Sequence, residues 1–119
     1  MSQVHQGSCH CGAVTFSLKS SLVPAVRCNC SLCQRKGIMM VTAEDDSFEL
    51  LTGQDALTLY QWNSHVAKHY FCKHCGIYTF HRPRSAPELT RVNAGCLEGL
   101  DPLTMEYQVV NGAALSLES

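Results

Sequence analysis

The sequence predicts an all-β domain of small sheets whose turns are clamped by metal, and three observations lead to this prediction. Apolar and polar residues alternate with a period of two in short segments, as they do in half-buried strands. No segment keeps a 3.6-residue period over ten or more residues, so helices should be few and short. Seven of the eight cysteines fall into three tight groups. The 119 residues suffice for one domain, which we place at residues 1–119.

The expected strands follow one another at short spacing. Val14, Phe16 and Leu18 alternate with polar residues just after Gly12, which predicts a strand. The flanks of the turn at Gly53 are expected to form a hairpin. The segment 82–87 contains two prolines and should be irregular. The remaining strand candidates, including the two arms of that hairpin, are 25–27, 38–43, 48–51, 57–62, 66–71, 77–81, 89–93 and 105–110.

Charge and hydropathy exclude several classes of protein. Nine Lys and Arg stand against ten Asp and Glu, so the basic surface of a nucleic-acid-binding protein is not expected. Residues 1–7 lack a basic region followed by an apolar stretch, and the longest aliphatic run is only 38–41, which argues against export and membrane spanning. We therefore expect a cytoplasmic protein that binds neither nucleic acid nor membranes, and its oligomeric state stays open.

The cysteine spacing favours metal binding over disulfides. Cysteines one or two residues apart are too close for relaxed pairing, whereas a short turn can direct both sulfurs at one ion. A disulfide scaffold would need an export signal. A redox pair at Cys72 and Cys75 would leave the other five clustered thiols without a role. The three groups are Cys9 and Cys11, then Cys28, Cys30 and Cys33, and then Cys72 and Cys75.

Two of the cysteine pairs make a complete ligand set. A structural zinc site usually takes two ligands from each of two short turns. Gly12 and Gly76 directly follow the two pairs, and glycine tolerates the positive φ that turns backbone amides toward the sulfurs. We therefore predict one Zn²⁺ bound by four sulfurs, from Cys9, Cys11, Cys72 and Cys75.

Cys28, Cys30 and Cys33 form a set of three, which does not close a tetrahedron. A second Zn²⁺ held by these three keeps a fourth position for water or substrate, as in catalytic zinc sites. Two alternatives stay open at this stage. A fourth protein group, such as Cys96 or a histidine, could complete the site. Otherwise Cys28 or Cys33 could be a buried apolar side chain with no metal nearby.

Four segments together resemble the glutathione-dependent formaldehyde-activating enzyme family, whose domain also occurs in centromere protein V. They are GSCHCGAVTF at 7–16, CNCSLCQRKG at 28–37, FCKHCG at 71–76 and VNAGCL at 92–97, and the likeness spans roughly residues 5 to 103. It implies a tent-like fold of small antiparallel sheets and the two zinc sites described above. The family's named activity joins formaldehyde to glutathione, giving S-hydroxymethylglutathione.

An open three-thiolate zinc suits thiol chemistry. Three thiolates leave the site with one net negative charge, so it activates water poorly, but a thiol in the fourth position loses its proton and stays nucleophilic. Attack on an aldehyde gives a hemithioacetal. We therefore expect a zinc-dependent carbon–sulfur lyase of the S-(hydroxymethyl)glutathione synthase type, with Cys28, Cys30 and Cys33 as catalytic residues. It would add glutathione or a similar thiol to formaldehyde or another small aldehyde. The alternative is a non-catalytic zinc-stabilised module that binds a protein partner.

Charged and hydrogen-bonding residues near the cysteines are candidates for substrate contacts. Arg35 and Lys36 follow Cys33 and could meet a glutathione carboxylate, or form a solvated basic turn. Arg82 and Arg84 could line the rim of a site for an anionic ligand. The aldehyde oxygen needs a proton donor, and the spacing selects none of the candidates, which are His65, His69, His74, His81, Tyr60 and Tyr78.

Overall fold

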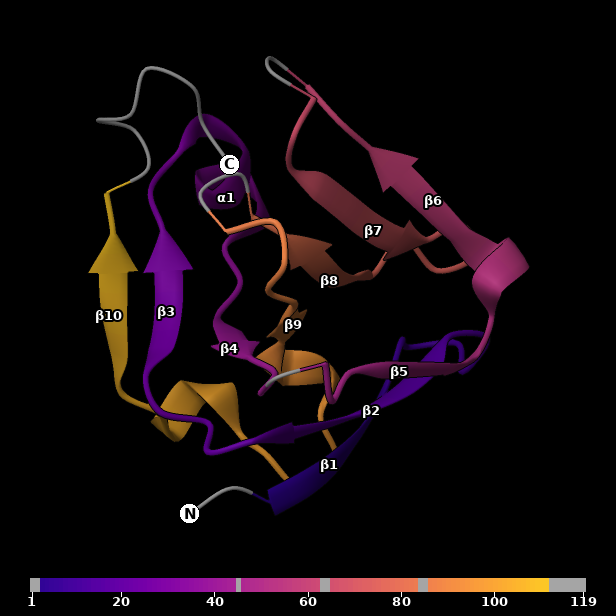
Figure 1. The fold of residues 1–119 in the computed structure, drawn as a ribbon, viewed down its shortest axis with the longest axis horizontal. Coiled ribbons are helices and arrows are strands. Elements are labelled where there is room, and N and C mark those ends of the chain that lie inside the picture. Colours follow the sequence, from indigo (N-terminus) through magenta and orange to yellow (C-terminus); the bar gives the residue numbers. More distant parts are fainter. Residues whose placement is uncertain (1–2, 45, 63–64, 84–85, 112–119) are drawn as a thin grey trace.

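The computed structural model describes residues 3–44, 46–62, 65–83 and 86–111, and its strands form two sheets (Figure 1). The smaller sheet has the order β1–β2–β5, with β1 at Gln3–Ser8, β2 at Thr15–Ser20 and β5 at Glu49–Thr52. The larger has the order β10–β3–β4–β9–β8–β7–β6. Its strands are β3 (Ala25–Cys28), β4 (Met40–Thr42), β6 (Leu57–Tyr60), β7 (Lys68–Cys72), β8 (Tyr78–Arg82), β9 (Arg91–Asn93) and β10 (Tyr107–Val110).

Helices are short in the described part of the chain, as the sequence predicts. α1 spans Ser31–Lys36, and single 3₁₀ turns lie at η1 (Gln54–Ala56), η2 (Ala94–Cys96) and η3 (Pro102–Thr104). α1 begins directly after Cys30, whose side chain accepts a hydrogen bond from the backbone amide of Cys33. Among these residues, no helix has the length and apolar character needed to cross a membrane.

The core lies between the two sheets, which lean together in Figure 1 as the two sides of a tent. Three aromatic rings join them. Phe16 of β2 lies 5.4 Å from the Phe48 centroid, and Phe48 lies 4.5 Å from the Phe80 centroid on β8. Val41 of β4 and Val92 of β9 are fully buried in the same cluster. The tent-like, mainly antiparallel all-β fold is therefore confirmed.

The pairing of the strands differs from the sequence prediction in two places. The segments 48–51 and 57–62 do not form a hairpin, because β5 pairs with β2 and β6 pairs with β7, and η1 carries the chain from one sheet to the other. β10 pairs with β3 in parallel, with Tyr107 opposite Ala25. A sequence pattern gives the faces of a strand but not its neighbours, so neither feature was evident.

One strand was not expected at all. β1 is the edge strand of the smaller sheet and has a mostly polar sequence, QVHQGS, with its first two residues exposed. Its more buried positions hold His5 and Gly7, while Val4 is 69% exposed, so the apolar alternation of a half-buried strand is absent. It nevertheless matters for the site, because the turn between β1 and β2 carries Cys9 and Cys11.

Candidate active site

The first four-cysteine group comes from two turns that lie far apart in the sequence. Cys9 and Cys11 lie between β1 and β2, while Cys72 and Cys75 lie where β7 turns into β8. All four sulfurs lie within 4.8 Å of one another, with Cys9 and Cys11 3.6 Å apart and Cys11 and Cys72 3.7 Å apart. Zinc–sulfur bonds of about 2.3 Å in a tetrahedron place sulfurs about 3.8 Å apart. The donor set and its spacing therefore fit a structural zinc.

Backbone amides approach the sulfurs of this group. The amide of Val14 donates to Cys9 Sγ over 3.3 Å, and Gly12 and Gly76 take the positive φ values of 84° and 76° that such turns require. Burial alone raises the pKa of Cys75, but the amides of Cys11 and Ile77 and the nearby thiols lower it to about 6. These turns therefore stabilise thiolate, which is the form that binds metal.

The four thiols do not ionise equally. Although the amide of Ala13 favours ionisation of Cys11, burial and the neighbouring thiols raise the pKa of Cys11 to about 11. Like charges in close contact oppose one another. The group therefore reaches its fully deprotonated form only when a cation compensates the charge.

The second group brings Cys28, Cys30 and Cys33 together at the junction of β3 and α1. Their sulfurs all lie within 4.8 Å. The amide of Cys30 donates to Cys28 Sγ over 3.4 Å, and the amide of Cys33 donates to Cys30 Sγ over 3.3 Å. The shared Cys28 hydrogen bond and burial raise the pKa of Cys33 well above its usual range. This donor set fits a zinc held from one side by three sulfurs.

Within the described ranges, no fourth cysteine, histidine or carboxylate joins this second group. Cys96, one of the candidates for a fourth ligand, is buried, and its thiol approaches the Tyr78 carbonyl over 3.8 Å. Burial raises the pKa of Cys96 to about 12. Among the described residues, Cys96 is therefore a buried thiol that belongs to neither cysteine group.

The two basic residues that follow Cys33 lie in different surroundings. Lys36 Nζ lies 3.5 Å from the centroid of the Tyr78 ring and within reach of the Cys33 thiol. Burial lowers the pKa of Lys36, although the negative charges of Cys33 and Cys30 oppose this effect. Arg35 donates instead to the carbonyl of Ser31 over 2.8 Å, on the exposed side of α1. Contact of either residue with glutathione stays a prediction.

Two of the six proton-donor candidates lie in contact with each other. The Tyr78 hydroxyl and His69 Nδ1 are 2.9 Å apart. Burial and nearby Lys36 lower the pKa of His69 to about 4, and burial and the nearby cysteine charges raise the pKa of Tyr78 well above 10. Both groups are therefore neutral near pH 7, which makes Tyr78 a neutral hydrogen-bond donor.

A pocket of about 380 Å³ lies over this pair, and we call it the Tyr78 pocket. The pocket lies between α1 and strands β6–β8, and Tyr78 is close enough to the second cysteine group to feel its charges. Tyr60 was also a proton-donor candidate, and it is 47% exposed at the pocket rim. The residues that line the pocket are Leu32, Lys36, Tyr60, His69, Phe71, Gly76 and Tyr78.

The remaining histidine candidates lie elsewhere. His81 is buried and stacks on His69 with the ring centroids 5.3 Å apart, but it does not line the Tyr78 pocket. Burial and the charges of Lys36, His69 and Arg91 hold its pKa well below the usual range. His65 and His74 are exposed.

A second pocket, of about 240 Å³, opens directly onto two of the sulfurs, and we call it the Cys33 pocket. Cys28 and Cys33 line it together with the polar side chains of Arg27, Asn29 and Gln34. The Arg27 guanidinium lies 5.0 Å from the Tyr107 ring centroid. Sequence reasoning missed Arg27, and its one available signal was its position directly before Cys28.

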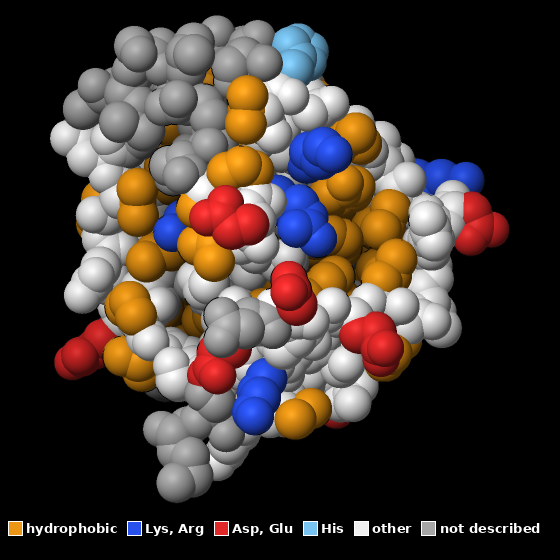
Figure 2. Space-filling view, viewed as in Figure 1, with side chains coloured by type: hydrophobic (Ala, Val, Ile, Leu, Met, Phe, Trp, Pro, Cys, Tyr) orange, Lys and Arg blue, Asp and Glu red, His pale blue; other side chains and the backbone are white. Residues whose placement is uncertain are grey.

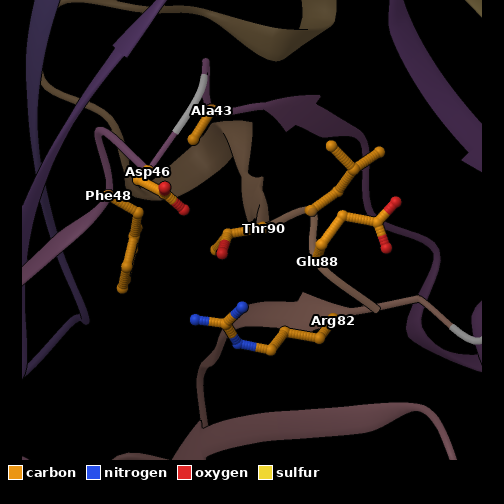
Figure 3. Close-up of a pocket in the computed structure, with 7 residues that line it drawn as sticks. Ala43, Asp46, Phe48, Arg82, Glu88 and Thr90 are labelled. Atoms are coloured by element: carbon orange, nitrogen blue, oxygen red, sulfur yellow. The ribbon is translucent and has the colours of Figure 1, made fainter. Parts of the chain in front are cut away.

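A third pocket, of about 450 Å³, shares no lining residue with either cysteine group (Figure 3). Arg82 points into it, but Asp46 and Glu88 line the same space. The negative charges of these two carboxylates repel an anionic ligand. Arg84, the other arginine predicted to line such a site, lies outside the described residues. On the face of the molecule shown in Figure 2, acidic and basic side chains are likewise interspersed.

Comparison with known proteins gives matches over most of the chain. A family model described as glutathione-dependent formaldehyde-activating enzyme matches residues 4–111. A crystal structure of a Rhodobacter sphaeroides protein is similar with a TM-score of 0.83 and 42% sequence identity, covering 88% of this chain and 99% of that one. The residues that the family model matches include both cysteine groups.

Proposed function

Because this chain belongs to the glutathione-dependent formaldehyde-activating enzyme family, we propose that it is a zinc-dependent carbon–sulfur lyase or synthase. It adds glutathione or a similar thiol to formaldehyde or another small aldehyde. The observation that carries this proposal is the incomplete ligand set of Cys28, Cys30 and Cys33, with no fourth ligand in the described ranges. Cys28 and Cys33 of that set line the Cys33 pocket.

Two zinc ions would have different tasks. Cys9, Cys11, Cys72 and Cys75 would hold one that joins two distant turns, and Cys28, Cys30 and Cys33 would hold the second. Bound to three thiolates, this second zinc supplies Lewis acidity that lowers the pKa of an incoming thiol without quenching its nucleophilicity. The buried Lys36 ammonium beside the cysteines offsets the net negative charge of such a site.

The Cys33 pocket offers the thiol a direct route to the sulfurs. Glutathione carries carboxylates and amides, and Arg27, Asn29 and Gln34 of this pocket supply matching donors and acceptors. Arg35 remains a proposed outer contact for a carboxylate, reached by turning away from the Ser31 carbonyl. The thiol substrate would then occupy a pocket that shares no lining residue with the Tyr78 pocket.

Tyr78 is the group best placed to stabilise the aldehyde oxygen. His69 Nε2 is buried without a hydrogen-bond partner among the described residues, and a bare acceptor there costs less than an orphaned N–H. We therefore assign the imidazole proton to Nδ1, which donates to the Tyr78 oxygen over the 2.9 Å contact. That tautomer leaves the Tyr78 O–H free to donate to an aldehyde oxygen as negative charge develops on it.

The reaction balances without a redox partner. In the synthase direction a carbon–sulfur bond forms and the carbonyl π pair moves to oxygen. The thiol loses one proton and the oxygen gains one. The reverse direction breaks the carbon–sulfur bond and releases aldehyde and thiol, which is the lyase activity.

A non-catalytic protein-binding module is the second candidate. The observation that favours it is the exposure of apolar side chains on edge strand β10, where Tyr107 and Val109 are 51% and 62% exposed. Exposed apolar patches often mark protein interfaces. If this candidate is correct, the protein accelerates no thiol–aldehyde reaction.

Exchange of ¹³C-formaldehyde with glutathione, followed by NMR, separates the two candidates. Protein loaded with two zinc ions should accelerate exchange above the uncatalysed rate. Cys30→Ser should lose one zinc and lower the acceleration about 100-fold or more, since even outer-shell changes at metal sites cost about 10–100-fold. Cys96→Ser, which alters a cysteine outside both groups, should keep both zinc ions and the activity. Equal exchange rates with and without the zinc-loaded protein would contradict the enzyme proposal.

A further inference from the structure

The walls of the Tyr78 pocket are mainly apolar. Two cross-strand pairs form its floor, because Tyr60 lies opposite His69 and Phe71 lies opposite Tyr78 in the strand register. Leu32, four residues before Lys36 on α1, closes the side. Side chains four residues apart share one face of a helix. One leucine and three aromatic rings therefore surround the space.

The polar groups of the pocket lie at its cysteine end. The Tyr78 hydroxyl meets His69 Nδ1, and Lys36 Nζ lies over the Tyr78 ring. Lys36 follows Cys33 by three residues on α1, which puts the two side chains on one face of the helix, and the charges of Cys33 and Cys30 act on both Lys36 and Tyr78. A molecule bound here would place a polar group toward the sulfurs and an apolar body against the aromatic walls.

The pocket is too large and too apolar for formaldehyde alone. Formaldehyde has two heavy atoms, about the bulk of one or two waters of about 30 Å³ each, whereas the pocket holds about 380 Å³. Sites of this size usually accommodate small organic ligands. Glutathione fits the pocket poorly as well, because Leu32, Phe71 and Gly76 offer no polar side chain to its carboxylates and amides.

We propose that the aldehyde substrate carries an apolar substituent of about the size of one aromatic ring, which fills the Tyr78 pocket while its carbonyl oxygen meets the Tyr78 hydroxyl. This inference deepens the proposed function and rests on it. The thiol approaches through the Cys33 pocket, which shares no lining residue with the Tyr78 pocket, so each substrate has a pocket of its own. The step is the same addition, with the substituted carbonyl carbon as the electrophile.

The first test compares aldehydes on the protein loaded with two zinc ions. Acceleration of exchange with glutathione is measured for formaldehyde, acetaldehyde and benzaldehyde. We expect kcat/KM for benzaldehyde to exceed that for formaldehyde at least about 10-fold, since filling an apolar pocket with even one methylene changes discrimination by about 10-fold or more. Leu32→Phe, which narrows the pocket, should reduce the benzaldehyde preference. Leu59→Phe is the matched control, because Leu59 lies on β6 but outside the pocket lining and is 46% exposed.

The second test measures binding without turnover. Benzyl alcohol and methanol serve as unreactive probes, and the imidazole signals of His69 are followed by NMR. Benzyl alcohol should shift these signals in the wild type and in Leu59→Phe, with a weaker effect in Leu32→Phe, and methanol should leave them unchanged at equal concentration.

The outcomes separate the two proposals. Acceleration with formaldehyde, together with no advantage for benzaldehyde and no His69 shift, overturns this inference and leaves the proposed function standing. No acceleration with any aldehyde overturns the proposed function, and this inference falls with it. A benzaldehyde preference that Leu32→Phe does not reduce also overturns the assignment to the Tyr78 pocket.

Discussion

Tyr78 connects the chemistry of the candidate site to the packing of the sheet. Its backbone carbonyl accepts a hydrogen bond from Asn93 Nδ2 over 2.9 Å, its ring lies under Lys36 Nζ, and its hydroxyl contacts His69. Each contact comes from a different element, so the position of the side chain is fixed from several directions. The sequence offered Tyr78 as one of six equal candidates. Only the strand register and the position of α1 distinguish it.

Removal of the Tyr78 hydroxyl tests its role directly. Tyr78→Phe keeps the ring under Lys36 but removes the donor to the aldehyde oxygen. We expect kcat to fall about 100-fold, as on the loss of one oxyanion donor, with a much smaller change in KM. Tyr60→Phe removes a hydroxyl from the rim of the same pocket and should have a far smaller effect. Equal losses of kcat in the two variants would show that the Tyr78 hydroxyl has no special role.

The buried histidines predict a loss of stability in mild acid. The pKa of His81 is held well below 6.5 in the folded chain, so below pH 6.5 the unfolded chain binds more protons. The free energy of unfolding then falls with pH by at most about 1.4 kcal/mol per unit for each such histidine. When urea unfolding is measured at fixed excess zinc, the free energy of unfolding should fall less between pH 6.5 and pH 5.5 for His81→Gln than for the wild type. Parallel declines would contradict the assignment of a neutral buried His81.

At the scale of elements, the cysteine turns were the most predictable feature of the molecule. The turn that ends β7 and begins β8 joins antiparallel strands, as the positions of Cys72 and Cys75 indicated. The sulfurs converge in the two groups that the spacing predicted, whereas zinc binding by them stays a proposal. A turn is a local structure, and local sequence determines it. The prediction of a hairpin at 48–62 was wrong, and the parallel β3–β10 pair was not predicted. The actual pairs join segments that are distant in the sequence, and no local pattern contains such contacts.

Loss of the proposed zinc clamp should weaken the contact between the sheets. Cys72→Ser breaks the four-sulfur set that ties the β1–β2 turn to the β7–β8 turn. Structural zinc contributes several kcal/mol of folding free energy or more, so we expect the thermal midpoint to fall by more than about 10 °C with loss of one zinc. Cys96→Ser should cost only about 1 kcal/mol and keep both zinc ions. Unchanged zinc content and midpoint in Cys72→Ser would show that this group is no clamp.

At the scale of the whole molecule, the fold keeps the two cysteine groups separate and gives them different numbers of sulfurs. The four-sulfur group joins a turn of the smaller sheet to a turn of the larger one, and the three-sulfur group lies where β3 meets the short helix α1 and lines the Cys33 pocket. The sequence alone predicted this division of ligands, because four sulfurs close a tetrahedron and three do not. It did not predict the pockets, since these depend on the packing of α1 against strands from the middle and end of the chain.

The central claim is that an outside thiol occupies the fourth position at Cys28, Cys30 and Cys33. The most direct measurement is X-ray absorption at the selenium edge of the selenol analogue of glutathione, mixed with protein loaded with two zinc ions. We predict a zinc neighbour at bonding distance from selenium, which disappears in Cys30→Ser. A selenium atom without a zinc neighbour in saturated wild-type protein that retains both ions would contradict the account.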